Sequence, residues 1–374
     1  QDLSVVKKGK MAIFHDDPSF ISASSSVMEL VNAVSALTNA VLAGPTQASV
    51  FLCFSFAFLC YVCGLASGYW SWVDRLWSIT PAIYIVIFAI YDPCPRLVLM
   101  AILACLWGFR LSFNFWRKGG YSEEEDYRWP VLRKLFLEKD PFHPLCQEIF
   151  QISFVAYYQH ILLWLISAPS AIRIYEFSKN NQKNKTFSFN NLLIEDYILT
   201  GIFLLLLSFE TLADEQQWIF QNKKHSMNDN EKKKKGGDYL RGFCTSGVFK
   251  YSRHLNFFCE QSIWWTIYGF SIIPSLHVSS SSSSEASLLG SLNFLINFAI
   301  LGPILLSLLF LGSTRMTENL SIKKYPLYSV YQQTTPMLIP SFSPGISLDS
   351  PQGQEMIISF IAKENEKLKR QKQM

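Results

Sequence analysis

Seven long apolar runs constrain the fold of this chain more than any other feature. A run of about 20 apolar residues spans a bilayer core, and in lipid its backbone polar groups are satisfied by an α-helix. We therefore predict an all-α polytopic membrane protein, a bundle of about seven transmembrane helices. The runs are Ser49–Tyr69, Leu76–Tyr91, Leu97–Phe115, Ile149–Ala168, Leu192–Leu212, Cys259–Leu276 and Leu288–Gly312.

Composition supports one membrane domain rather than several soluble ones. Hydrophobic residues make up 49% of the 374 residues, and charged residues make up only 17%, below the roughly 25% that is usual in soluble domains. We predict an N-terminal lumenal segment over 1–48, with an interfacial helix at Val27–Ala43, a membrane domain over 49–340 and a charged cytosolic tail over 341–374. Three polar low-complexity patches are predicted to be loops: Ser178–Lys185, His225–Gly237 and Ser279–Ser284.

The loop charges predict the orientation in the membrane. With seven spans, 24 of the 33 Lys and Arg residues fall on the side that carries the C-terminus, and 8 fall on the other side. The side richer in Lys and Arg faces the cytosol in most membrane proteins. We therefore expect a lumenal N-terminus and a cytosolic C-terminus. The sequence Asn184-Lys185-Thr186 then becomes a lumenal glycosylation acceptor.

Polar residues gather at the ends of the spans on the predicted cytosolic side. Charges at bilayer depth are costly and usually face a cavity or a pathway. Residues three, four or seven positions apart share one helical face, so each of three helices presents a polar stripe. This pattern predicts a ligand cavity open to the cytosol, in preference to hydrogen bonds between helices alone. The stripes are Arg110, Asn114 and Arg117; Glu210, Asp214 and Gln217; and Asn256 and Glu260.

Several common chemistries lack their motifs in this sequence. It contains no G-x-G-x-x-G, P-loop, G-x-S-x-G or H-E-x-x-H, so Rossmann cofactor binding, ATP hydrolysis, serine-hydrolase chemistry and a catalytic zinc have no support. We predict no metal site. The run Lys232–Lys235 is more typical of a solvated loop than of a nucleic-acid site, and no nucleic-acid partner is expected. Arginines near the predicted cavity suit the phosphates of a nucleotide.

Four sequence blocks resemble a known family, the DUF1295 branch of the steroid 5-alpha-reductase-like superfamily of integral-membrane proteins. The first runs from Leu106-Trp107-Gly108-Phe109-Arg110-Leu111 to Glu125-Asp126-Tyr127-Arg128-Trp129. The second is similar to F-E-x-x-A-D-x-Q. The third is similar to G-x-[WF]-x-x-S-R-H-P-N-Y-x-G-E, and a C-terminal block carries the last match. These three blocks are Phe209–Gln217, Gly247–Glu260 and Tyr325–Pro340.

The resemblance implies a lipid reductase of the endoplasmic reticulum that binds NADPH from the cytosol. The bond reduced would be a carbon–carbon double bond in a lipid substrate taken from the bilayer. Asn256 and Glu260 would hold the nicotinamide, and Asp214 and Arg253 the ribose and phosphates. Reduction also needs a proton donor, for which we select Tyr127. The full set of expected cofactor-binding residues is Arg110, Asp126, Arg128, Asp214, Gln217, Arg253, His254, Asn256 and Glu260.

Three departures from the family pattern fall in the third block. Leu255 replaces the expected Pro, Phe257 the expected Tyr and Cys259 the expected Gly. A side chain at Cys259 would fill space that a cofactor needs if that position approaches it. Two alternatives therefore stand beside the reductase. One is a membrane S-adenosylmethionine-dependent methyltransferase, which shares the Arg-His…Asn…Glu pattern, and the other is a non-catalytic lipid-binding relative.

Overall fold

The computed structural model describes residues 43–122, 125–126, 128–137, 143–184, 191–281 and 296–373, together with four isolated residues between 32 and 39. Most of the predicted interfacial helix, Val27–Ala43, lies outside the described residues, as does Tyr127. Within the described ranges the regular structure is helical throughout, which confirms the predicted all-α class.

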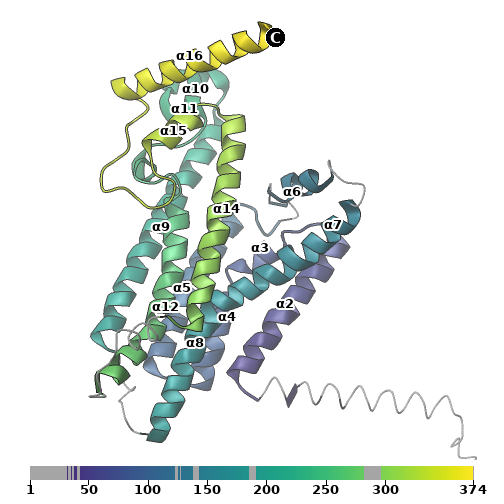
Figure 1. Ribbon diagram of the computed structural model, residues 1–374, viewed down its shortest axis with the longest axis vertical. Helices are drawn as coiled ribbons and strands as arrows, with labels where there is room; N and C mark the ends of the chain where they lie inside the picture. The colour runs from purple at the N-terminus through teal and green to yellow at the C-terminus, as the bar shows by residue number, and fades with distance from the viewer. Residues whose placement is uncertain are drawn as a thin grey trace, which may run out of the picture.

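Most of the described helices follow one another with short connections, and the segment between α15 and α16 is longer (Figure 1). The first half of the chain contains α2 (Pro45–Ser67), α3 (Trp72–Trp77), α4 (Thr80–Tyr91), α5 (Pro95–Arg117), α6 (Arg128–Leu137), α7 (His143–Phe150), the π-helix η1 (Gln151–Tyr158) and α8 (Gln159–Asn184). The second half contains α9 (Ile194–Ser226), α10 (Asp229–Lys235), α11 (Gly237–Arg241), the 3₁₀ helix η2 (Gly247–Lys250), α12 (Leu255–Ser281), the 3₁₀ helix η3 (Phe298–Ile300), α14 (Leu301–Lys324), α15 (Tyr328–Thr334) and α16 (Pro351–Gln373).

Six helical segments in the described part of the chain are long and apolar enough to cross a membrane. They correspond to six of the seven predicted spans and confirm a multi-pass membrane protein. The short second span is completed by α3, which continues into α4 across a break before Pro81; proline is tolerated at the first turn of a helix but not in its interior. The six segments are Pro45–Ser67, Trp72–Tyr91, Pro95–Arg117, Leu145–Asn180, Ile194–Ser226 and Phe298–Lys324.

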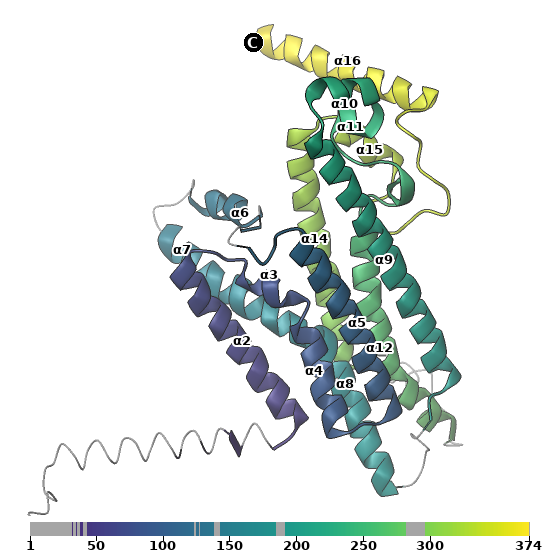
Figure 2. The same cartoon turned by 180° about the vertical axis from the view of Figure 1, so that it is seen from behind.

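The remaining predicted span, Cys259–Leu276, lies within α12 and is not among these six segments. Its surroundings differ from those of a helix that faces lipid. α12 packs extensively against α9 and also contacts α8 and α14, and both views show it inside the bundle, with α2 and α9 on opposite flanks (Figures 1 and 2). Trp264 and Phe270 on this helix are fully buried. A helix enclosed by other helices meets little lipid, so it can carry polar groups that find partners inside the protein.

Two of the predicted loops are wrong because helices continue through them. α8 carries on past Pro169 to Asn184, through most of the patch Ser178–Lys185. Within the patch His225–Gly237, the lysines form α10, whose first turn is closed by reciprocal hydrogen bonds between Asn228 and Glu231. Such a capping box stabilises even a short polar helix.

Helices α5 and α9 run parallel and are joined by ion pairs at three levels. Arg96 and Asp196 form a buried two-pronged pair with N–O distances of 2.6 and 2.7 Å. Arg110 pairs with Glu210 at 2.6 Å, and Arg117 contacts Glu215. Along α5, the first and last levels are about 31 Å apart at 1.5 Å per residue, close to the thickness of the hydrocarbon core. The middle level therefore lies inside the membrane-spanning part.

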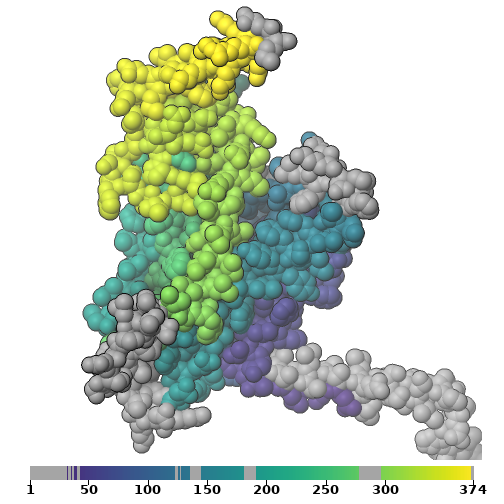
Figure 3. Space-filling model, in the orientation of Figure 1, coloured from purple at the N-terminus to yellow at the C-terminus, as the bar shows by residue number. Residues whose placement is uncertain are grey.

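The segments after α14 and around α10 form a small assembly at one end of the bundle. Its apolar centre contains Phe243, Tyr328, Tyr331, Leu348 and Ile357. Figure 3 shows the C-terminal residues, in yellow, covering this end. The assembly encloses the third and fourth sequence blocks, which places their motif residues beside the membrane-spanning helices.

Candidate functional site

One large cavity, of about 880 Å³, lies within the bundle. Its volume is in the range of small-molecule and cofactor pockets, roughly 300–1,000 Å³. The polar lining residues of α5, α9 and α12, with Lys118 just after α5, are called the polar wall, and the apolar lining residues of the end of α7, of η1 and of α14 are called the apolar wall. The polar wall contains Asn114, Lys118, Glu210, Asp214, Asn256 and Glu260; the apolar wall contains Phe150, Phe154, Tyr158, Leu308, Leu309, Phe310 and Met316.

Asp214 is the centre of the polar wall. Its carboxylate accepts hydrogen bonds from Asn114 Nδ2 at 2.8 Å and Asn256 Nδ2 at 3.1 Å, and it also contacts the Arg110 guanidinium. The Lys118 ammonium lies 3.9 Å from it. These partners come from α5 and α12, so the carboxylate of α9 fixes three helices around the same corner of the cavity. The structure thus brings the predicted residues Asp214 and Asn256 together.

Arg110 stands behind this wall rather than in the cavity lining. Its guanidinium donates to Glu210 Oε1 at 2.6 Å and to the Glu210 carbonyl at 3.0 Å, in addition to its contact with Asp214. A guanidinium occupied in this way positions the two carboxylates and neutralises part of their charge. Glu210 keeps one buried oxygen, Oε2, to which no described residue donates a hydrogen bond.

Glu260 is held by two tryptophans, which the sequence reasoning missed. Trp107 Nε1 donates to one carboxylate oxygen at 2.8 Å, and Trp264 Nε1 donates to the other at 3.1 Å. The two indole rings pack edge to face with their centroids 4.7 Å apart. Indoles only donate hydrogen bonds, so they fix the carboxylate without neutralising it. Trp264 lies four residues after Glu260 and could have been found by helical spacing, whereas Trp107 is on a distant helix.

Arg253 and His254 do not line the cavity. Arg253 donates to both oxygens of Glu318, at 2.6 and 3.0 Å, and to the carbonyl of Gln332 at 3.1 Å. The His254 ring lies 3.0 Å from Glu318 Oε1. Both side chains thus connect the start of α12 to α14 and to the segment that follows α15. The structure places them in a joint between segments, and the cofactor contacts that the resemblance implies for them stay a prediction.

A third part of the lining comes from α3, from the loop before α6 and from the first turn of α6. Arg128 donates to Asp126 at 2.7 Å, and Trp129 Nε1 donates to Asp74 at 2.7 Å. All four residues line the cavity. Asp126 and Arg128, two of the expected cofactor-binding residues, are thus part of the lining. Tyr127, the expected proton donor between them, is outside the described residues.

In the second block, Glu210 and Asp214 line the cavity, and Gln216 rather than Gln217 links α9 to another segment. Gln217 is partly buried and does not line the cavity. Gln216 donates to the carbonyl of Ser246 at 2.6 Å and accepts from the amide of Val248 at 3.0 Å. It thereby fastens α9 to the loop that leads into η2, a structural role that the motif alone does not reveal.

The three departures from the family pattern have different surroundings. Leu255 and Cys259 are buried together in an apolar cluster with Ala213, Phe220 and Phe249, and neither lines the cavity. The Cys259 side chain therefore takes no space from a ligand. Phe257 does line the cavity, where its ring stacks on His254 with centroids 5.5 Å apart. Of the three, only Phe257 changes the surface that a ligand meets.

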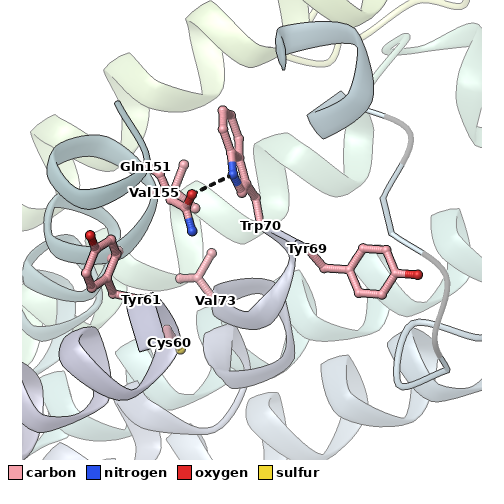
Figure 4. Close-up of a pocket in the computed structure, with 8 residues that line it drawn as sticks. Cys60, Tyr61, Tyr69, Trp70, Val73, Gln151 and Val155 are labelled. Carbon is pink, nitrogen blue, oxygen red and sulfur yellow. Dashed lines mark hydrogen bonds between the residues drawn. The ribbon is translucent and has the colours of Figure 1, made fainter. Parts of the chain in front are cut away.

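A second cavity, of about 10 Å³, lies between α2, the start of α3 and η1 (Figure 4). Trp70 Nε1 donates to Gln151 Oε1 at 3.0 Å across it. This space is about the size of one water molecule. The hydrogen bond joins the two segments, and the cavity has no room for a substrate.

Comparison with known proteins places this fold in a family. The family described as "Protein of unknown function (DUF1295)" matches residues 60–335. The chain belongs to this family. The resemblance drawn from the four sequence blocks is therefore confirmed. An uncharacterised protein of Schizosaccharomyces pombe is 33% identical over 281 residues, which cover 72% of each chain. No solved structure matches the chain significantly.

Proposed function

We propose that this DUF1295 protein is a membrane-embedded reductase that uses NADPH to reduce a carbon–carbon double bond of a lipid. The observation that carries the proposal is the two-sided cavity: Asp214, Asn256 and Glu260 form one wall, and aromatic and aliphatic side chains form the other. A polar wall of amides and carboxylates suits a nicotinamide nucleotide, and an apolar wall suits a lipid.

The polar wall fits the nicotinamide carboxamide in its hydrogen-bonding capacity. Each carboxylate oxygen can accept about two hydrogen bonds, and each oxygen of Glu260 accepts one from an indole. Glu260 can therefore accept another from the carboxamide NH₂. Bound NADPH would supply the hydride. The protein would hold the nicotinamide with Asn256 and Glu260, and Tyr127, the expected proton donor, would supply the proton.

The apolar wall supports a hydrophobic substrate. Phe150 at the end of α7 and Phe154 and Tyr158 of η1 stack in a row, with successive centroids 4.9 and 5.2 Å apart. π-helical turns are frequent at functional sites, and here the π-helix presents a continuous aromatic surface to the cavity. Leu308, Leu309 and Met316 of α14 face the same space. Burial of a lipid against these side chains is favourable because it removes apolar surface from water.

One observation favours a second candidate, the S-adenosylmethionine-dependent methyltransferase. Among the described residues, the cavity lining contains five carboxylates but only two cationic side chains, Lys118 and Arg128. An acidic lining suits a ligand with a sulfonium and an ammonium group. The carboxylates are Asp74, Asp126, Glu210, Asp214 and Glu260.

A cofactor-binding experiment separates these proposals. We expect NADPH to raise the melting temperature of the purified protein in a neutral detergent, because a ligand at 100 times its Kd stabilises the folded state by about 2.7 kcal/mol. NADH and S-adenosylmethionine are measured in parallel. A shift with S-adenosylmethionine but not with NADPH would replace the reductase by the methyltransferase. No shift with any of the three would favour a non-catalytic lipid-binding protein.

We further propose that the protein resides in the endoplasmic reticulum with its C-terminus in the cytosol, as the loop charges predict. A protease added outside sealed microsomes should then remove the C-terminal tail and spare the loop that contains Lys185. Asn184 should carry a glycan in at least part of the population. Protection of the tail from the protease would contradict this orientation, and a plasma-membrane signal from a tagged protein at native expression would contradict the location.

A further inference from the structure

Lys118 differs from the other cationic side chains around the cavity in having no hydrogen-bond acceptor among the described residues. Its ammonium lies 3.9 Å from Asp214, beyond hydrogen-bonding distance. Arg110 is held by Glu210 and Asp214, Arg117 donates to Asn114 and contacts Glu215, and Arg128 is held by Asp126. Lys118 lines the cavity and offers three N–H donors.

The surroundings of Lys118 leave its N–H donors available to a ligand. Its side chain keeps 42% of its surface exposed, so it stands at the mouth of the cavity. Partial desolvation of the ammonium lowers the pKa of Lys118, an effect that Asp214 opposes. An anionic group bound at the mouth would satisfy the N–H donors and stabilise the charged form.

The position of Lys118 relative to Asn256 shows which anionic group it would meet. Both side chains approach the same oxygen, Oδ1 of Asp214, Asn256 at 3.1 Å and Lys118 at 3.9 Å. Glu260 lies one helical turn after Asn256 on α12 and is buried, whereas Lys118 is exposed. The polar wall thus runs from Glu260 inside the bundle, past Asn256, to Lys118 at the mouth. In a nicotinamide dinucleotide, one ribose separates the nicotinamide from the nearest phosphate.

We propose that Lys118 binds the phosphate that adjoins the nicotinamide ribose, which is one of the two phosphates in the dinucleotide's pyrophosphate. This inference rests on the proposed NADPH site and adds a residue that no motif indicated. It also gives the phosphates a cationic partner at the mouth of a cavity whose lining is otherwise rich in carboxylates. NADPH and NADH carry the same pyrophosphate, so Lys118 should contribute equally to the binding of both. A lysine that recognised the 2′-phosphate would favour NADPH alone.

Lys118 also has a possible structural role, because it caps the C-terminus of α5, where a cation interacts favourably with the helix dipole. Lys323 provides a matched control. It lies in the last turn of α14, is exposed and does not line the cavity. A helix-end effect alone should make Lys118→Met and Lys323→Met similar in thermal stability and leave ligand binding unchanged in both.

The test is a fluorescence titration of NADPH and of NADH into wild type, Lys118→Met, Lys118→Arg and Lys323→Met in neutral detergent. We expect Lys118→Met to weaken both dinucleotides by about tenfold, the scale of one charge-assisted hydrogen bond. Lys118→Arg should restore part of the affinity, and Lys323→Met should bind as wild type does.

The outcomes separate this inference from the proposed function. Wild-type binding with no change in Lys118→Met would overturn the role of Lys118 and leave the NADPH site standing. Weakening of NADPH but not of NADH would assign Lys118 to the 2′-phosphate and also overturn the inference. If wild type binds neither dinucleotide, the proposed function fails, and the inference fails with it.

Discussion

Arg253→Met should lower the free energy of unfolding by about 3–5 kcal/mol, the usual cost of removing one partner of a buried ion pair. Arg253 and Glu318 are both nearly buried, with side chains 7% and 5% exposed. The substitution leaves the Glu318 carboxylate without its guanidinium partner, and it leaves the carbonyls of Gln332 and Thr335 without their donor. Each unsatisfied buried group adds to the cost.

Thermal unfolding of the purified variants measures this effect. Arg315→Met is the matched control, because Arg315 is exposed on the same helix as Glu318, and surface substitutions usually change stability by less than about 0.5 kcal/mol. The double variant Arg253→Met/Glu318→Leu should recover part of the loss, since it removes the unpaired carboxylate. If Arg253→Met is as stable as wild type but binds NADPH poorly, Arg253 belongs to the cofactor site after all, and its structural assignment is wrong.

The transmembrane helices and the polar stripes could be predicted from the sequence because they depend on local patterns. Apolar runs of the required length identified six spans, and spacing along α9 placed Glu210 and Asp214 on one face. The same spacing overextended the stripe to Gln217, one turn beyond the cavity. The segment Ser178–Lys185 was predicted to be a loop because its composition is rich in Asn and Lys. Composition alone did not reveal that α8 continues past Pro169 into this segment.

The partners of the motif residues could not be predicted, because they come from distant parts of the chain. Glu318 lies 65 residues after Arg253, and no spacing rule links them. Trp107 lies 153 residues before Glu260. A charged motif residue looks the same in the sequence whether it faces a ligand or an ion pair. In the structure, Asp214, Asn256 and Glu260 line the cavity, whereas Arg253 and His254 contact Glu318 and do not line it.

Glu260→Gln should weaken NADPH binding by about ten- to a hundredfold. Glu260 is the carboxylate that the proposed site offers to the nicotinamide carboxamide, and a hydrogen bond to a charged group contributes roughly 1.5–3 kcal/mol, with tenfold in affinity for each 1.4 kcal/mol. The substitution preserves size. However, the amide replaces one of the two acceptor oxygens with an NH₂ donor, so one of Trp107 and Trp264 then faces a donor in place of its acceptor.

Because Glu260→Gln also disturbs the hydrogen bonds from the two indoles, a control variant is necessary. Trp264→Phe removes one indole donor and leaves the Glu260 carboxylate intact, so it reports the cost of disturbing this arrangement without changing the charge. We expect Trp264→Phe to bind NADPH far better than Glu260→Gln does, with a similar melting temperature for both. NADPH titration of the two variants beside wild type provides the measurement. Equal affinities of Glu260→Gln and wild type would show that the nicotinamide does not lie at Glu260, and the cavity would then need another ligand.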